Sequence, residues 1–203
     1  IWFTIIYFSR IFSYIKHIEI MKNKYIIIFL FFIINFKTTI NAMENNTFYD
    51  FKIESLIGET INLNTYKGKP ILLVNVASNC GFTKQYSELE YLWNRYKEKN
   101  LIILGVPSNQ FGNQEPGTNE EIKKFCKVNF NITFQMTSKY DVKGDNAHDI
   151  FKWAKKSHGN SAVPKWNFHK ILIDKEGKIY DTFSSFTNPL SKKITNKIEK
   201  ILN

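Results

Sequence analysis

KGKPILLVNV, at residues 67–76, decides the fold: a turn signal is followed by a short apolar run that is typical of a buried strand. Across residues 83–97 apolar side chains recur at helical spacing, and LIILGV at residues 101–106 has the pattern of a second buried strand. Strand, helix and strand in this order predict a βαβ unit with parallel strands and a right-handed crossover. We therefore expect an α/β protein.

The segments downstream extend this unit with further helices and a hairpin. They are a helix from the capping box TNEE (118–121) to about residue 128, a helix over 147–156, strands over 168–173 and 179–183 joined by the turn KEGK (175–178), and a helix over 189–202. These elements predict a central mixed sheet flanked by helices.

Composition limits the classes of protein to consider. The 203 residues include only two cysteines, which excludes a scaffold held together by disulfides and a four-cysteine zinc site. The formal net charge of +10 attracts nucleic acids, anionic membranes and acidic proteins alike. Because the basic residues form no block, we expect no nucleic-acid partner.

The N-terminal residues 1–42 have the pattern of a targeting segment. Met21 opens the basic stretch MKNK, a ten-residue apolar run follows at residues 25–34, and Ala42 is a small cleavage residue. Ten helical residues span about 15 Å, too short for a bilayer core of about 30 Å. We predict a signal peptide that leads to the secretory route and an organelle such as a plastid, with a membrane anchor or a buried helix as alternatives. The domain is expected at residues 43–203, and a start at Met43 predicts a cytosolic form.

Cys80 is the first candidate for chemistry, because it follows the first buried strand and precedes a helix. Backbone N–H groups and the helix dipole favour a thiolate there, although many free cysteines are simply small buried side chains. A cysteine and histidine pair of the protease type also stays open. We expect neither a metal nor another cofactor, because the four histidines lack ligand spacing with Cys80: His17, His148, His158 and His169.

Three motifs, in order, resemble the glutathione peroxidase family. They are NVASNCGFT at residues 75–83, NQFGNQEPG at 109–117 and KWNF at 165–168. The resemblance runs from about Phe48 to the C-terminus and is to the cysteine-containing, phospholipid-hydroperoxide-like branch. It implies a thioredoxin-like fold and a peroxidase that acts on hydrogen peroxide and on organic or lipid hydroperoxides.

The resemblance also implies a catalytic tetrad of Cys80, Gln114, Trp166 and Asn167. Cys80 as thiolate attacks a peroxide oxygen and becomes a sulfenic acid. The other three side chains carry N–H donors, which can bind the anionic sulfur and orient the peroxide. Without the resemblance, Trp166 is more simply a core residue, and Gln114 and Asn167 are ordinary loop residues.

Cys126 shares a helical face with Ile122 and Phe125, so we expect it to be buried. The resemblance to thioredoxin-dependent members implies instead that Cys126 resolves the sulfenic acid by forming a disulfide with Cys80. Because a disulfide needs Cα atoms within about 7 Å, the helix is then expected to unwind or swing in each turnover.

The resemblance implies thioredoxin as the reductant and, from the short connection at residues 157–165, a monomer with an open active site. Three rival functions remain at this stage. They are a one-cysteine peroxidase reduced by glutathione, a peroxide sensor that relays oxidation to a partner, and a noncatalytic domain that binds anionic membranes.

Overall fold

The computed structural model describes residues 46–203, so the predicted signal peptide and the boundary at residue 42 lie outside the described residues. The described chain forms one compact unit, Thr47–Asn203. Four short 3₁₀ helices connect its main elements: η1 (Phe48–Asp50), η2 (Leu63–Tyr66), η3 (Lys97–Lys99) and η4 (Gly159–Ala162).

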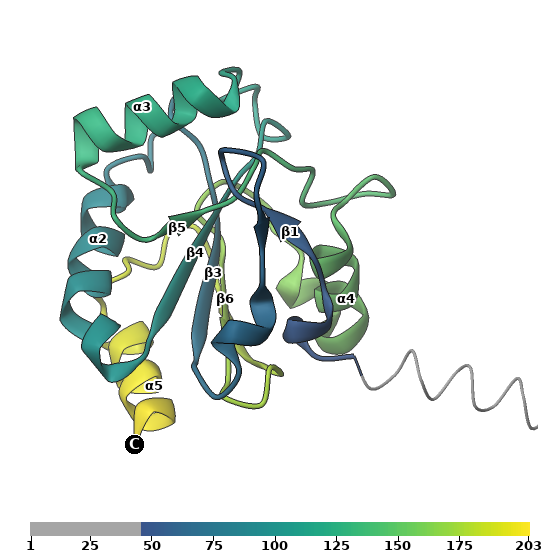
Figure 1. The fold of residues 1–203 in the computed structure, drawn as a ribbon, viewed down its shortest axis with the longest axis vertical. Coiled ribbons are helices and arrows are strands. Elements are labelled where there is room, and N and C mark those ends of the chain that lie inside the picture. The colour runs from purple at the N-terminus through teal and green to yellow at the C-terminus, as the bar shows by residue number, and fades with distance from the viewer. Residues whose placement is uncertain (1–45) are drawn as a thin grey trace, which may run out of the picture. The chain divides into compact units, whose positions relative to one another are not determined.

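A five-stranded sheet in the order β5-β4-β3-β6-β7 forms the centre (Figure 1). Its strands are β3 (Ile71–Val76), β4 (Ile102–Pro107), β5 (Gln135–Met136), β6 (Lys170–Ile173) and β7 (Ile179–Phe183). β3 pairs in parallel with β4 and β4 with β5, while β6 pairs antiparallel with both β3 and β7. The βαβ unit and the C-terminal hairpin predicted from the sequence are therefore confirmed.

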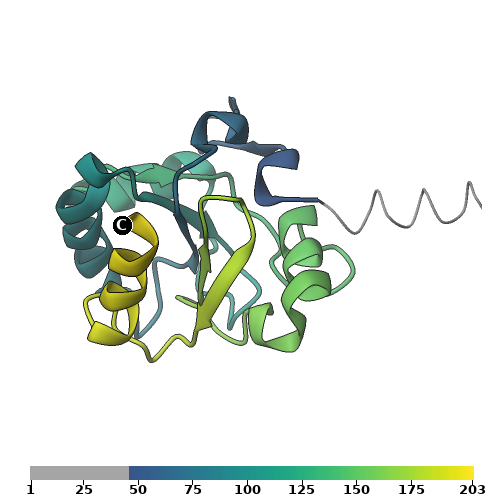
Figure 2. The ribbon, with the colours of Figure 1, turned by 90° about the horizontal axis from the view of Figure 1, so that it is seen from below.

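Helices cover both faces of the sheet: α2 (Gln85–Tyr96) and α5 (Lys192–Leu202) lie on one side and α4 (Asp149–His158) on the other (Figure 2). Every residue of β3 is buried. Leu72 and Val74 pack into the core beneath α2 and α5, whereas Ile71 and Leu73 pack into the core beneath α4. Successive side chains point to opposite faces of a strand, so a continuous apolar run is what a strand covered on both faces requires.

α3 (Asn119–Phe130) crosses the end of the sheet at which β3 ends and the loop that carries Cys80 begins (Figure 1). The predicted capping box is present, because the Thr118 hydroxyl accepts a hydrogen bond from the Glu121 N–H and the Glu121 carboxylate accepts one from the Thr118 N–H. Asn131 ends the helix in the left-handed conformation, with φ of 48°. The helix continues two residues beyond its predicted end at Val128.

Several boundaries differ from the prediction by one to three residues. α2 begins at Gln85 and not at Thr83, because the Thr83 hydroxyl is used in the preceding turn. α4 lies two residues later than predicted, with the side chain of His148 as its N-cap, and α5 begins at Lys192 after Ser191. β4 starts and ends one residue later, and β6 begins at Lys170 because Asn167–His169 form a turn.

Two short features were absent from the prediction. β1 (Ile53–Glu54) and β2 (Thr60–Ile61) form a small antiparallel pair, and β5 adds two residues to the edge of the main sheet. Strands of two residues carry too little alternation to be recognised in a sequence.

Candidate active site

Cys80 lies in the loop that leaves the carboxyl end of β3, where its thiol is partly exposed. The Thr83 hydroxyl accepts a hydrogen bond from the Cys80 N–H at 3.0 Å and donates to the Ala77 carbonyl at 3.0 Å, which fixes the loop. The Phe82 N–H donates to the sulfur at 3.4 Å. Since α2 begins only at Gln85, the backbone hydrogen bond to the sulfur comes from the loop and not from the first turn of a helix.

Gln114 is joined to the Cys80 loop through its backbone, because its carbonyl accepts a hydrogen bond from the Asn79 N–H at 3.0 Å. Its side chain is joined to the third motif, because its Oε1 accepts a hydrogen bond from Asn167 Nδ2 at 2.9 Å. An amide whose oxygen is occupied in this way presents its NH₂ group as a donor. Asn167 is fully buried, and within residues 46–203 its Oδ1 has no hydrogen-bond partner.

Trp166 is 39% exposed and packs against Phe111, with ring centroids 5.9 Å apart. Gly112, at φ of 64°, lies between this indole and Gln114, since a Cβ added to it would be 3.7 Å from both Gln114 Nε2 and Trp166 Cη2. The structure thus brings Gln114, Trp166 and Asn167 together at the loop that carries Cys80.

Asn75 is a site residue that the sequence analysis missed. It is the one polar side chain of β3 and is 1% exposed. Its Nδ2 donates to the Trp166 carbonyl at 3.1 Å, its Oδ1 accepts from the His169 N–H at 3.1 Å, and its carbonyl accepts from the Phe168 N–H at 2.6 Å. These bonds hold the Trp166–His169 turn, in which Phe168 has φ of 63°. The feature of the sequence that could have identified Asn75 is its place as an asparagine inside an otherwise apolar strand.

Glu115 is a second residue that the sequence analysis did not use. Its carboxylate, 1% exposed, accepts a hydrogen bond from the Ser78 hydroxyl at 3.2 Å. Its N–H donates to Asn109 Oδ1 at 2.9 Å. Burial raises the pKa of Glu115, and the hydrogen bond from Ser78 partly opposes this shift. The carboxyl thereby joins the turn that carries Gln114 to the loop that carries Cys80.

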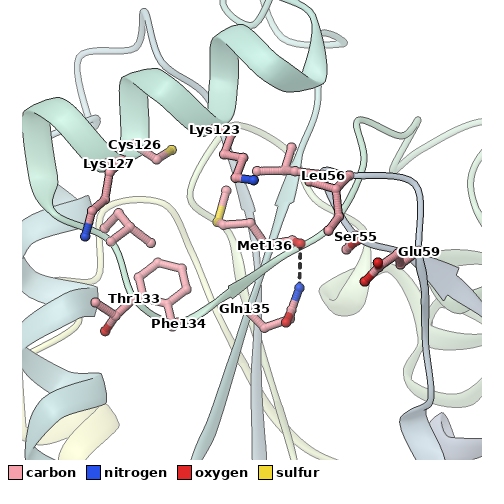
Figure 3. A pocket seen from close by; sticks show the side chains of 12 residues that line it. Ser55, Leu56, Glu59, Lys123, Cys126, Lys127, Thr133, Phe134, Gln135 and Met136 are labelled. Carbon is pink, nitrogen blue, oxygen red and sulfur yellow. Dashed lines mark hydrogen bonds between the residues drawn. The ribbon is translucent and has the colours of Figure 1, made fainter.

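Cys126 is buried on the inner face of α3, as its helical spacing predicted. Burial raises the pKa of its thiol to about 11, the hydroxyl of Tyr86 acts in the opposite direction, and Glu115 adds to the rise. Figure 3 shows Cys126 on the underside of α3, above Phe134 and Met136, at the wall of a pocket of about 330 Å³. Both cysteines of the chain are free thiols in this structure.

α3 is anchored by two buried side chains, Ile122 and Cys126, and by the partly buried Phe125 and Phe130, which pack against the same core. The pocket beside Cys126 lies along one flank. A second pocket, of about 270 Å³, lies between the other flank and the Cys80 loop, where Ile122 and Phe125 face Ser78 and Asn79. Local unfolding of this helix therefore has to release Ile122, Phe125, Cys126 and Phe130 from the core.

The histidines do not form a metal site in the described part of the chain. Residues 46–203 contain no group of three or more His, Cys, Asp or Glu side chains arranged to hold a metal ion. His148 caps α4, His169 is buried beside β6, and none of the three described histidines hydrogen bonds to Cys80. His17 lies outside the described residues.

None of the helices between residues 46 and 203 combines the length and apolar content needed to cross a membrane.

Curated proteins with related sequences cover nearly the whole described chain. Glutathione peroxidase-like peroxiredoxin 2 of Saccharomyces cerevisiae is 44% identical over 160 residues, which are 77% of this chain and 97% of that protein. Hydroperoxy fatty acid reductase gpx1 of Synechocystis sp. is 41% identical over 169 residues, 79% of this chain and 99% of that protein.

Solved structures agree with the sequence matches. The structure of Trgpx in its apo form is 36% identical with a TM-score of 0.64, and the match covers 78% of this chain and 96% of that one. A thiol:disulfide interchange protein of the thioredoxin family from Chlorobium tepidum has a TM-score of 0.57 at 12% identity, over 75% of this chain and 93% of that one. This second likeness concerns the fold alone and confirms the thioredoxin-like fold.

The glutathione peroxidase family model matches residues 48–155, more than half of the chain, and this span contains Cys80, Gln114 and Cys126. Together with relatives above 40% identity over almost their full length, the match shows that this chain belongs to the glutathione peroxidase family.

Proposed function

We propose that the protein is a thiol peroxidase in which Cys80 reduces hydrogen peroxide and organic hydroperoxides, including lipid hydroperoxides. The observation that carries the proposal is the partly exposed Cys80 sulfur, which accepts a backbone N–H bond in a loop joined to the Gln114–Asn167 pair. The names of the relatives, a peroxiredoxin and a hydroperoxy fatty acid reductase, support the same chemistry.

In the first step the Cys80 thiolate attacks the terminal peroxide oxygen. The S–O bond forms as the O–O bond breaks, the sulfur is oxidised to a sulfenic acid, and the leaving oxygen takes a proton to become an alcohol or water. Gln114 Nε2 and the Trp166 indole N–H are the proposed donors to the peroxide and the sulfur. Asn167 directs Gln114, because its hydrogen bond occupies the Gln114 oxygen and turns the NH₂ group away.

In the second step Cys126 attacks the sulfenic sulfur, a Cys80–Cys126 disulfide forms, and the hydroxyl group leaves as water. The buried Cys126 thiol, with a pKa raised to about 11, is poorly reactive while α3 is folded. The exposure of most α3 side chains and the pocket between the helix and the Cys80 loop support unwinding as the route to the disulfide. We also propose that the active protein is a monomer.

The proposed reductant is thioredoxin, whose dithiol returns the disulfide to two thiols. In the rival cycle glutathione attacks the Cys80 sulfenic acid directly and Cys126 has no role. In a sensor the same disulfide is passed to a partner and turnover is slow.

A coupled assay tests the function and separates these cycles. Peroxide-dependent NADPH oxidation is measured with thioredoxin and its reductase, or with glutathione and its reductase. We expect the wild type to turn over many times with thioredoxin and poorly with glutathione, whereas Cys80→Ser is inactive because a hydroxyl is neither ionised nor comparably nucleophilic.

Cys126→Ser is the decisive variant in this assay. It is expected to reduce about one equivalent of peroxide and then stop with thioredoxin, with Cys80 found as sulfenic or over-oxidised acid by mass spectrometry. Undiminished thioredoxin-supported turnover in Cys126→Ser would contradict the resolving role and favour direct attack by an external thiol.

A further inference from the structure

An exposed aromatic side chain is held rigidly near the candidate nucleophile. Phe186 lies in the loop between β7 and α5 and is 83% exposed. The residues on both sides of it are fixed, because the Ser185 carbonyl accepts a hydrogen bond from Gln85 Nε2 at 2.8 Å and the Thr187 carbonyl accepts one from Lys170 Nζ at 2.7 Å. Both donors come from buried residues. The phenyl ring is therefore kept in solvent by the fold.

The ring of Phe186 packs against Phe82, the second residue after Cys80. Phe82, whose N–H donates to the Cys80 sulfur, has its ring centroid 5.1 Å from that of Phe186, at an interplanar angle of 87°. This edge-to-face geometry is the favourable one for two phenyl rings. One member of the pair thus contacts the nucleophile through its backbone, and the other extends the pair into solvent.

We propose that the Phe82–Phe186 pair is the surface that binds the apolar substituent of organic hydroperoxides during the reaction at Cys80. This inference rests on the proposed peroxidase function. The substituent is attached to the leaving oxygen, so a hydroperoxide bound at the Cys80 sulfur must place its chain on the protein surface around Cys80. An aromatic surface there covers the chain and removes apolar area from water. Hydrogen peroxide has no substituent, so the aromatic pair does not favour its binding.

Gln85 and Lys170 are positioning residues for this surface. Lys170 Nζ also donates to Gln85 Oε1 at 2.5 Å, so the two buried side chains form one bonded unit beneath the loop. The Asn188 side chain donates a hydrogen bond of 2.6 Å to the carboxylate of Glu88, which lies on α2 with Gln85. Three loop residues (Ser185, Thr187 and Asn188) are thereby tied to Gln85 and Glu88 of α2 and to Lys170 of β6. The aromatic pair therefore needs no ordering when a chain binds.

The test measures the oxidation of the Cys80 thiol without any reductant. Wild type, Phe186→Ala and Phe186→Leu are mixed with either hydrogen peroxide or linoleic acid hydroperoxide below its micelle concentration, quenched with an alkylating agent, and analysed by mass spectrometry. Phe186→Ala is expected to lower the second-order rate constant about five-fold with linoleic acid hydroperoxide, since apolar area against the chain is lost. The constant for hydrogen peroxide is expected to stay within about two-fold, and Phe186→Leu to recover most of the loss.

Tyr91→Ala is the matched control, because it removes another largely exposed aromatic ring, farther along α2; neither rate constant should change. If Phe186→Ala lowered the rate constants for both peroxides equally, the loop would have a structural role. If it lowered neither rate constant, the aromatic pair would not bind the substituent. If neither rate constant fell but Phe186→Ala lost thioredoxin-supported turnover in the coupled assay, the pair would belong to a thioredoxin docking surface. Each of these three results overturns the proposal. If the wild type itself kept its Cys80 thiol with both peroxides, the peroxidase function would fail instead.

Discussion

At the scale of single residues, the donors of the proposed site are neutral groups. The Phe82 N–H reaches the Cys80 sulfur, and the Gln114 amide is oriented by Asn167. Asn75 holds the turn from which Trp166 and Asn167 project. Preorganised dipoles of this kind stabilise charge that develops in a transition state without reorganising during the reaction.

Gln114→Ala is expected to lower the second-order rate constant for Cys80 oxidation by hydrogen peroxide by roughly ten- to hundred-fold, because one preorganised donor is lost. Rapid-quench alkylation measures this constant. Gln110→Ala is the matched control, since its amide lies in the same motif but bonds to the backbone of Val142 and Lys143. If Gln110→Ala lowered the constant as much as Gln114→Ala, the effect would belong to the loop and not to a catalytic donor.

At the scale of elements, α3 combines a capped N-terminus with a body of which one face packs on the core and the rest is exposed. Its capping box provides hydrogen-bond acceptors for the N–H groups of Thr118 and Glu121. Among its side chains, Ile122 and Cys126 are the two that are buried. A resolving cysteine on such a helix couples chemistry to local unfolding, so the stability of α3 is expected to set the rate of disulfide formation.

Thr118→Ala is therefore expected to accelerate formation of the Cys80–Cys126 disulfide. Loss of an N-cap hydroxyl weakens a helix by about 1 kcal/mol, which corresponds to roughly a five-fold larger unfolded population. Cys80 oxidation itself should not change. The two steps are separated by quenching at different times and counting free thiols by mass.

Ser191→Ala, at the N-cap of α5, provides the control because its hydroxyl makes no cap hydrogen bond. Hydrogen exchange gives an independent measurement, since amides of Asn119–Phe130 should lose protection when the disulfide forms. A disulfide that forms at the wild-type rate in Thr118→Ala, with protection retained, would mean that α3 does not unwind.

At the scale of the whole molecule, the sequence determines the sheet more clearly than the site. The βαβ unit follows from two apolar runs and one amphipathic segment, and the C-terminal hairpin follows from its turn. The partners of Asn75 could not be deduced in this way, because Trp166 lies 91 residues away and bonds through its carbonyl. The same holds for Glu115 and Ser78, 37 residues apart. Long-range side-chain bonds leave no periodic signal in a sequence.

Lys170 shows how one such buried bond affects the stability of the whole domain. It is fully buried in β6, and its ammonium group bonds to Gln85 and to the Thr187 carbonyl. Burial lowers its pKa to about 7, while Glu88 acts in the opposite direction. A lysine with a lowered native pKa binds fewer protons in the folded state than in the unfolded state, so its contribution to stability increases as the pH rises above about 7.

The free energy of unfolding is therefore expected to gain roughly 1 to 2 kcal/mol from Lys170 between about pH 6.5 and 8.5. Lys170→Met should lose this gain, since it keeps the chain length and removes the titrating group. Burial also lowers the pKa of His169 to about 4 and raises the pKa of the Cys126 thiol to about 11. Both groups are present in the wild type and in Lys170→Met, so their contributions cancel in the comparison. Urea unfolding of both proteins at several pH values measures the difference between them. Parallel pH profiles for wild type and Lys170→Met would show that Lys170 keeps its proton in the fold, with its bonds to Gln85 and Thr187 compensating for the burial of the charge.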